Sequence, residues 1–415
     1  MSSFSIALSG LTASSSDLDI TANNIANADT VGFKESRAEF ADVYASGAVN
    51  LNTSVTGEGV RLASTSQQFT QGNISTSSSN LDLAISGDGF FTLKDANGVV
   101  YSRNGQFAED SSGNVVSSTG QALQVYPPLV NGGFNTGALS DLNLQTAQSA
   151  PQSTTTGTVI LNLPAGAPVP TVPAFNPANS LTYNQSTSTT VYDSLGQSYP
   201  ATMYFVQTAA PNVVDVYMTV NGTPVNATVA NPNGVPQALT FSNTGAVTLP
   251  VGGGLTFGGF TPPDGAQPMN MAFNFGQTTQ YGGGFGVTSI TQNGYATGQL
   301  STVAIDSSGI VSAVYTNGRS TQLGQLAMAN FPNPQGLKQL GDTNWSETFT
   351  SGNVVSGTAS SAGFGSIQSG ALESSNVDLT TELVNMITAQ RSFDSNAQVI
   401  TTANQESQTV IQISH

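Results

Sequence analysis

The two ends of this 415-residue chain carry the same heptad pattern. Near the N-terminus the pattern runs through Phe4, Leu8, Leu11, Ser15, Leu18, Ala22 and Ile25. Near the C-terminus it runs through Leu379, Leu383, Met386, Gln390, Phe393, Ala397, Ile400, Asn404, Ser407 and Ile411. Alternating steps of four and three residues place side chains on one seam of a helix. Each end is therefore predicted to be an amphipathic helix that needs a partner, and the two are expected to pair as a coiled coil.

The two ends cannot pair through opposite charges, because both are acidic. The N-terminal stretch holds Asp17, Asp19 and Asp29 and no base. The stretch from residue 373 onward contains one base, Arg391, and a larger number of acids: Glu373, Asp378, Glu382, Asp394 and Glu406. Salt bridges between e and g positions are therefore excluded. Two interpretations stay open: a long helical hairpin within one subunit, or helices that order fully only among copies of the chain.

The charge balance also limits the kinds of partner. Lys and Arg number 8 against 24 Asp and Glu, and the net charge is −16. Nucleic acid and acidic membrane surfaces need clustered bases, so neither is expected as a partner. The chain has no cysteine, which removes disulfides and thiolate metal sites and fits an extracellular protein held together without bridges.

Targeting signals are not visible in the sequence. The N-terminal stretch lacks a basic segment followed by a continuous apolar run, so a Sec signal peptide is not expected. No stretch reaches the 18 or so apolar residues of a membrane span, and membrane insertion is not expected. The protein is expected to be cytoplasmic or to leave the cell without cleavage of a signal peptide.

The middle of the chain is predicted to be all β. Phe90 to Leu93, Asn97-Gly98 and Val99 to Tyr101 together form a hairpin signature. Similar Asn-Gly turns recur between runs of Val, Thr, Tyr and Phe as far as about residue 365. Before this region, the first helix is expected to stop near Asn27. Residues 31–72 are expected to form a connecting segment, in which Phe33, Phe40, Val43 and Tyr44 suggest a short helical turn.

Two stretches rich in Pro or Gly, 145–180 and 250–286, predict the edges of an inserted domain. The expected fold is mainly β with α-helical termini and discontinuous, nested domains. The terminal helical domain comprises 1–30 and 372–415, the first β-domain comprises 73–146 and 288–371, and the inserted outer β-domain comprises 147–287.

Catalytic groups are hard to assemble from this composition. The single histidine, His415, is the last residue, and no His or Cys pair has metal-ligand spacing. We therefore expect no enzymatic activity, no cofactor and no metal. Two other classes stay open: a secreted β-rich adhesin, and a carbohydrate-active enzyme that would use two of the many carboxylates.

Motifs at both ends resemble the bacterial flagellar rod and hook axial proteins. The N-terminal motif is Asn23-Asn24-Ile25-Ala26-Asn27 followed by Thr30-Val31-Gly32-Phe33-Lys34. The C-terminal motif is Gly370 to Leu379, followed by Glu382-Leu383-Val384 and Ala389-Gln390-Arg391. Ser86 to Phe91 and Tyr101 to Phe107 are similar to the first β-domain of that family. Within the family, a large inserted β-domain with Val191 to Gly196 is typical of hook subunits rather than of the shorter distal rod subunits.

The resemblance implies a structural polymer of many copies of this chain. Such a polymer would be a curved, flexible tube that joins rod to filament and works as a universal joint under motor torque. Its implied partners are rod proteins, hook-filament junction proteins, the hook cap and the flagellar export apparatus. Its implied location is extracellular, in the hook of the flagellar axis. The terminal seams would then be the assembly interface, and a distal rod protein is the alternative within the family.

Overall fold

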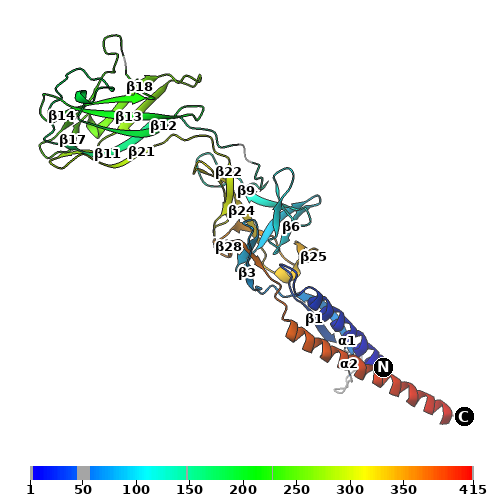
Figure 1. Cartoon of the computed structure of the whole chain (residues 1–415). Helices are drawn as coiled ribbons and strands as arrows, with labels where there is room; N and C mark the ends of the chain where they lie inside the picture. The colour runs from blue at the N-terminus through cyan, green and yellow to red at the C-terminus, as the bar shows by residue number, and fades with distance from the viewer. Residues whose placement is uncertain (1–2, 44–56, 146–147, 227, 414–415) are drawn as a thin grey trace. The chain divides into compact units, whose positions relative to one another are not determined.

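The computed structural model describes residues 3–43, 57–145, 148–226 and 228–413. They group into two compact units (Figure 1). Unit 1 comprises Met1–Gln145, Thr302–Ala313 and Ser320–His415, and unit 2 comprises Thr146–Ser301 and Val314–Arg319. Because unit 1 contains both ends of the chain, unit 2 is an insertion into it.

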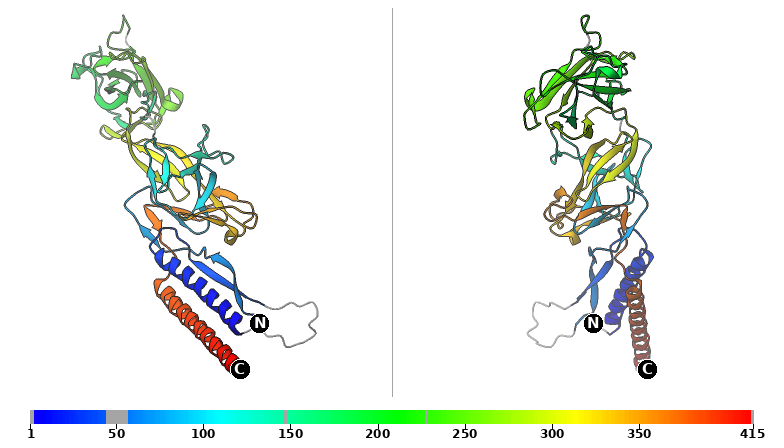
Figure 2. Two further views of the ribbon diagram at one scale, coloured as in Figure 1. Left: turned by 90° about the vertical axis from the view of Figure 1, so that its right-hand side faces the viewer. Right: turned by 60° about the vertical axis from the view of Figure 1, so that its left-hand side comes forward.

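Two helices form the terminal part of unit 1. Helix α1 is Ser3–Ala26 and helix α2 is Leu379–Ile413. The Asn27 side chain donates to the Asn23 carbonyl (2.9 Å) where α1 ends, and Asp378 Oδ1 accepts from the Thr381 amide (2.9 Å) where α2 begins. Such bonds satisfy polar groups that a helix end leaves unpaired. The helices lie side by side and run antiparallel (Figures 1 and 2), which confirms the expected pairing.

A two-stranded ribbon lies beside α1. Strand β1 (Ser36–Asp42) pairs antiparallel with β2 (Val60–Gln67), and both contact α1 (Figure 2). The expected helical turn at Phe33, Phe40 and Val43 is therefore wrong, and Tyr44 lies outside the described residues. Seven residues in a row pair with β2, so cross-strand hydrogen bonding prevails over a weak helical spacing.

The β part of unit 1 centres on a 12-stranded sheet. Its main order is β22-β23-β24-β9-β5-β6-β26-β25. The strands are β5 (Phe90–Asp95), β6 (Gly98–Ser102), β7 (Phe107–Glu109), β8 (Val115–Ser117), β9 (Ala122–Tyr126), β10 (Ser140–Asp141), β22 (Leu300–Ile305), β23 (Ile310–Tyr315), β24 (Ser320–Asn330), β25 (Lys338–Gly341), β26 (Asn344–Ser346) and β27 (Val355–Thr358). The short 3-10 helix η3 is Pro334–Gly336. The predicted hairpin is confirmed as β5 and β6, with Leu93 opposite Val100.

Two small sheets join distant parts of the chain within unit 1. Strand β3 (Ile74–Thr76) pairs with β29 (Ala371–Glu373), and β4 (Leu83–Ser86) pairs with β28 (Ser366–Ser369). The apolar core beside them includes Leu83, Phe91 and Leu123. A second cluster surrounds Trp345, whose ring meets those of Phe69 and Phe90 edge-on. Edge-on aromatic packing adds specific geometry to apolar burial.

Unit 2 is built from two sheets that share one core. The first contains β12 (Gln185–Tyr192), β13 (Ser198–Gln207), β14 (Val213–Val220), β15 (Thr223–Pro224), β16 (Gln237–Phe241) and β17 (Val247–Leu249). The second contains β11 (Thr156–Pro164), β18 (Gly254–Phe260), β19 (Met269–Asn274), β20 (Thr279–Tyr281) and β21 (Gly286–Gln292). The 3-10 helices η1 and η2 are Ser180–Thr182 and Val251–Gly253. Met203, Phe257 and Phe273 lie in the common core, as expected for a β-sandwich.

Strands β12 to β17 lie between the two Pro- or Gly-rich stretches, as expected for an all-β middle of the chain. The end of the insertion differs in position from the expected residue 287. That residue lies within β21, which pairs with β11, and unit 2 continues to Ser301. A Gly-rich stretch therefore precedes a strand of the inserted unit here instead of ending the unit.

Candidate assembly site

The face of α1 that packs inside the subunit is not the predicted apolar seam. Ala7, Thr21 and Asn24 are the buried residues of α1. Gly10 lies between them in the same heptad steps, and a Cβ there would lie 2.7 Å from Asn396 Oδ1 of α2. The inner face is thus one residue, or about 100°, away from the predicted seam. It consists of small and polar side chains, which allow the helix backbones to approach closely.

The inner face of α2 overlaps the predicted seam only in part. Glu382 and Ala389 are buried. Gly10 meets Asn396 toward one end of the helix pair, and Asn24 and Glu382 line a common groove toward the other, as an antiparallel pair requires. Because this contact is narrow and partly polar, it leaves much of the apolar surface of both helices uncovered.

The structure places the predicted seam residues in three groups. Phe4, Leu8, Ala22, Leu379 and Leu383 are exposed. Leu11, Leu18, Ile25, Met386, Phe393, Ala397 and Ile400 are half-buried. Ile411 belongs to α2, but its side chain lies outside the described residues. Half of the side-chain surface of Leu8 and Leu383 faces solvent, at 47% and 50% exposure. Phe4 with Leu8 and Leu379 with Leu383 each stand four residues apart on one helix, and exposed apolar groups of this kind are typical of an interaction surface.

The outward face of α2 carries further apolar residues that the heptad prediction missed. Val384 and Ile387 are 58% and 49% exposed. They stand three residues apart on one side of the helix, followed four residues later by Arg391. The signal was present in the sequence as an i, i+3 pair, but it falls outside the seam that the longer heptad pattern defines.

Three of the quoted motifs meet in a buried ion cluster where the helices join the β part of unit 1. Lys34 Nζ lies 2.7 Å from Glu373 Oε1, and Arg103 Nη1 lies 3.2 Å from Glu373 Oε2. All three side chains are buried. The Gly72 amide donates to Glu373 Oε1 (2.9 Å), and Lys34 Nζ donates to the Thr70 carbonyl (2.8 Å). We call Lys34, Arg103 and Glu373 the junction triad.

Burial and charge act against each other in the junction triad. Burial lowers the pKa of Lys34 and that of Arg103 from their ordinary values, and the Glu373 carboxylate opposes both shifts. A buried charge is tolerated when it is paired and hydrogen-bonded. Here one carboxylate is the counter-charge of two cations, so the loss of Glu373 would leave both Lys34 and Arg103 without an ion pair.

The N-terminal motif shapes the path of the chain at this junction. The Asn24 side chain donates to the Ser36 carbonyl (2.8 Å) and accepts from the Ser36 amide (2.9 Å), which joins α1 to β1. Gly32 has a φ of +70°, and its amide donates to the Glu373 carbonyl (2.8 Å). Phe33 is buried beside it. The remaining motif residues are less enclosed: Asn23 and Ala26 are exposed, and Ile25 and Asn27 are half-buried.

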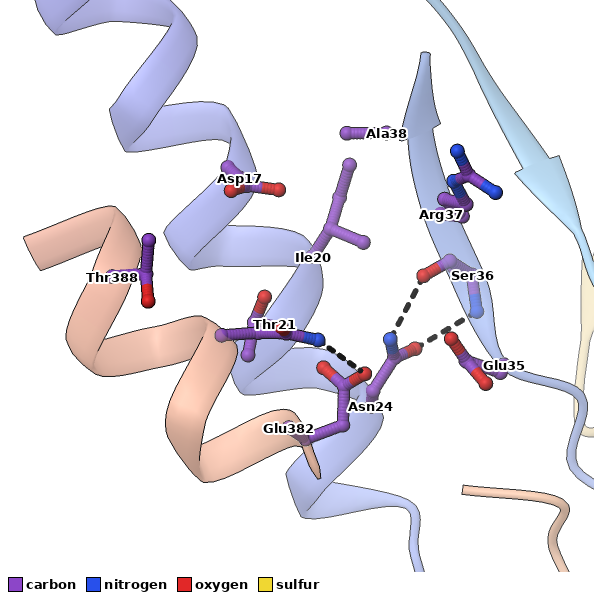
Figure 3. Close-up of a pocket in the computed structure, with 11 residues that line it drawn as sticks. Asp17, Ile20, Thr21, Asn24, Glu35, Ser36, Arg37, Ala38, Glu382 and Thr388 are labelled. Atoms are coloured by element: carbon purple, nitrogen blue, oxygen red, sulfur yellow. Dashed lines mark hydrogen bonds between the residues drawn. The ribbon is translucent and has the colours of Figure 1, made fainter. Parts of the chain in front are cut away.

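A groove of about 250 Å³ opens between α1, α2 and β1 (Figure 3). Asp17 and Asn24 reach it from α1, Glu35 and Arg37 from the start of the ribbon, and Glu382 from α2 (Figure 3). We call this cavity the acidic groove. Burial raises the pKa of Asp17, and burial together with the charge of Glu382 raises the pKa of Glu35. For Glu35, burial and the charge of Glu382 therefore outweigh the attraction of Arg37.

The described residues also bear on metal binding and on membrane insertion. Their His, Cys, Asp and Glu side chains nowhere gather in a group of three or more that could hold a metal ion. Neither α1 nor α2, as far as they are described, is long and apolar enough to cross a membrane.

Profiles of flagellar axial protein families match most of the chain. Residues 4–34 match "Flagella basal body rod protein", and residues 84–161 match "Flagellar hook protein FlgE/F/G D1 domain". Residues 162–295 match "Flagellar basal body protein FlaE D2 domain", and residues 368–413 match "Flagellar basal body rod FlgEFG protein C-terminal". The matches follow the nested order of terminal helices, first β region and insertion.

Relatives with the name "Flagellar hook protein FlgE" align with nearly the whole chain. The protein from Escherichia coli strain K12 is 38% identical over 99% of both chains, and that from Borreliella burgdorferi is 31% identical over 98% of both. A crystal structure of Helicobacter pylori flagellar hook protein FlgE2 covers 72% of this chain with a TM-score of 0.51 and 14% identity, which shows a shared fold. The alternatives of a distal rod protein and an adhesin are not favoured. The chain belongs to the flagellar hook protein FlgE family and is a structural subunit of the bacterial flagellar hook.

Proposed function

We propose that this subunit polymerises through α1 and α2 into the curved, flexible tube that joins rod to filament and transmits motor torque. The observation that carries the proposal is the uncovered apolar seam. Phe4, Leu8, Leu379 and Leu383 remain exposed to solvent in the isolated subunit. Their burial by neighbouring copies would stabilise the polymer by about 25 cal/mol for each Å² of apolar surface removed from water.

In this proposal the terminal helices form the inner wall of the tube and order fully as neighbours bind. The helices would then form a hairpin in the free subunit and bind other copies during assembly. The small, polar face of α1 holds α2 within one subunit, and the apolar seam binds other copies. Assembly would complete the burial that the isolated subunit leaves unfinished.

The junction triad would pass load from helices to β part. Lys34 follows α1 and Glu373 precedes α2, while Arg103 follows β6. A force on either helix would therefore reach the β part at one buried, hydrogen-bonded point. The β surfaces, with few charges, would contact neighbours through small, hydrated interfaces that exchange partners as the tube bends.

The finer assignments follow from this role. We propose contacts with rod and hook-filament junction proteins at the two ends of the tube, with the hook cap during growth, and with the flagellar export apparatus. The subunit would act outside the cell without catalytic activity. It would retain its N-terminal residues on export, because α1 contributes the seam. Mass analysis of chains from purified hooks would check this, and loss of α1 would contradict it.

Electron microscopy of the full chain under salting-out conditions tests the central proposal. Wild-type protein should form tubes, and Leu8→Asp and Leu383→Asp should stop tube formation without lowering the melting temperature of unit 1. Phe349→Asp is the matched control, because Phe349 is an exposed apolar residue in a loop after β26. Tubes from the helix variants, or no tubes from the wild type, would overturn the proposal.

A further inference from the structure

The acidic groove holds a buried carboxylate that is short of partners. Glu382 is only 4% exposed and lines the groove. The Asn385 side chain donates to Glu382 Oε1 at 3.3 Å, and no described residue donates to Oε2. Glu382 Oε2 is not among the fully buried side-chain atoms that lack a partner, so it stays accessible from the groove. The groove therefore offers an acceptor that a group from outside the subunit can satisfy.

The subunit itself supplies little positive charge to the groove. Arg37 is the base among the lining residues, and it is exposed, with its Nε 3.7 Å from Glu39 on β1. Asp17 and Glu35 remain beside Glu382 without an ion pair among the described residues. The described residues also hold no metal-binding group of acids, so an organic cation on a side chain suits the groove better than a metal ion.

A base of suitable placement lies on the opposite face of the same helix. Arg391 follows Glu382 by nine residues, about two and a half turns at about 3.6 residues per turn, so the two side chains point in opposite directions. Arg391 is exposed and makes no ion pair within the described residues. Exposed Val384 and Ile387 precede it on its own face.

We propose that the outward face of α2, comprising Val384, Ile387 and Arg391, docks in the acidic groove of a second copy of the chain. Arg391 meets Glu382 and Glu35 there, while Val384 and Ile387 cover Ile20 and Ala38 of the lining. The proposal rests on the proposed function, because it identifies one contact of the polymer.

The placement of these two surfaces also accounts for an open assembly. The outward face of α2 and the acidic groove are different surfaces of one subunit, so a contact between them is head-to-tail. A row of subunits joined in this way keeps one free surface at each end and can grow further. Such contacts build rings or helical filaments, whereas a self-complementary patch would stop at a dimer. Arg61 and Lys338 are the other exposed bases of unit 1 without an ion pair in its described part, and both lie outside helices.

Charge reversal on the full chain tests this contact. Arg391→Glu and Glu35→Lys should each raise the lowest protein concentration that gives tubes by about a hundredfold. An equal mixture of the two variants should assemble near the wild-type concentration, because Arg391 of one variant fits the intact groove of the other. In the other contact of the mixture, the α2 face of the Arg391→Glu variant meets the groove of the Glu35→Lys variant, and the two substituted side chains have opposite charges. Arg391→Lys keeps the charge and should assemble, and Arg61→Glu is the control of equal charge change.

The outcomes separate this contact from the wider function. If the wild type forms no tubes, the proposed function fails. If the wild type and Arg391→Glu assemble at equal concentrations, only the docking contact fails. Circular dichroism and Trp345 fluorescence establish that each variant is folded. If both folded variants fail alone and their mixture also fails, or if Arg61→Glu blocks assembly instead, the pairing of Arg391 with the groove is wrong.

Discussion

Lys34 and Glu373 are 339 positions apart in the chain, yet Lys34 Nζ lies 2.7 Å from Glu373 Oε1 in a buried ion pair. The pair joins the segment between α1 and β1 to β29, the last strand before α2. Arg103 completes the junction triad through the other carboxylate oxygen. The triad therefore ties both ends of the chain to the β part, independently of any contact between the helices.

Replacing Glu373 by Gln should lower the free energy of unfolding of unit 1 by about 3–5 kcal/mol, because two buried cations lose their counter-charge. Urea denaturation followed by fluorescence measures this loss. Trp345 is the only tryptophan of the chain and is 1% exposed in unit 1, so its emission reports unfolding of that unit.

Glu39→Gln is the matched control for Glu373→Gln. It removes an exposed ion pair, with 3.7 Å between Arg37 Nε and Glu39 Oε1, and should cost less than about 1 kcal/mol. An equal decrease in the free energy of unfolding in the two variants would show that burial of the triad does not increase its contribution to stability.

Replacing Asn24 by Ala should destabilise the join between α1 and β1 by about 1–3 kcal/mol, because the amide and carbonyl of Ser36 lose their partners. Thermal melting of the helical circular dichroism signal measures the effect. Asn23→Ala is the neighbouring control, since Asn23 is exposed, and its change should stay within about 0.5 kcal/mol. A larger effect at Asn23 would contradict the assigned roles.

The helices and strands could be predicted from the sequence because their signals are local. Heptad spacing, Asp378 before α2 and Asn27 after α1 mark the helices, and the Asn97-Gly98 turn marks a hairpin. The inner face of α1 could not be predicted in this way. Two neighbouring registers both follow steps of three and four, and the predicted assembly seam is the more apolar of the two. In a polymer subunit, a helix has partners outside its own chain, so apolar character alone does not identify the inner face.

The junction triad also could not be predicted from spacing. Its members lie in three separate motifs, and only the folded chain brings them together. The predicted terminal domain begins again at residue 372, which separates Glu373 from Lys34 in the predicted connecting segment and from Arg103 in the predicted first β-domain. In the structure β29 ends at Glu373 and pairs with β3. A truncation that removes the helices should therefore cut after Asp378, so that the triad stays complete.

Replacing Gly32 by Ala should destabilise unit 1 more than the same change at Gly120. Both glycines have positive φ, +70° and +88°, where a Cβ costs roughly 1–2 kcal/mol. At Gly32 the new Cβ would also lie 2.6 Å from the Asn104 amide nitrogen, whereas at Gly120 nothing lies within 4 Å. Backbone atoms cannot move aside as a side chain can. Urea denaturation of both variants checks the order, and equal losses would refute the steric account.

Replacing Glu35 by Gln should stabilise the helical part near neutral pH and have little effect at about pH 4. Burial and the charge of Glu382 raise the pKa of Glu35 above its ordinary value of 4.5. The folded chain then binds a proton that the unfolded chain has released, so stability falls as pH rises from 4.5 through the folded-state pKa. Gln resembles the protonated side chain and removes this loss.

Thermal melting of the helical signal at several pH values measures the difference between Glu35→Gln and the wild type. The two curves should coincide at acid pH and separate as pH rises, with the variant melting higher. Asp19→Asn is the control, since Asp19 is an exposed carboxylate of α1 outside the lining of the acidic groove. In tubes, the higher melting temperature of Glu35→Gln should become smaller than in the free subunit or reverse. In the proposed contact, Arg391 of the neighbouring copy lies beside Glu35 and stabilises its charged form. A variant that melts lower than the wild type at neutral pH as a free subunit would show that Glu35 has a stabilising partner within its own chain.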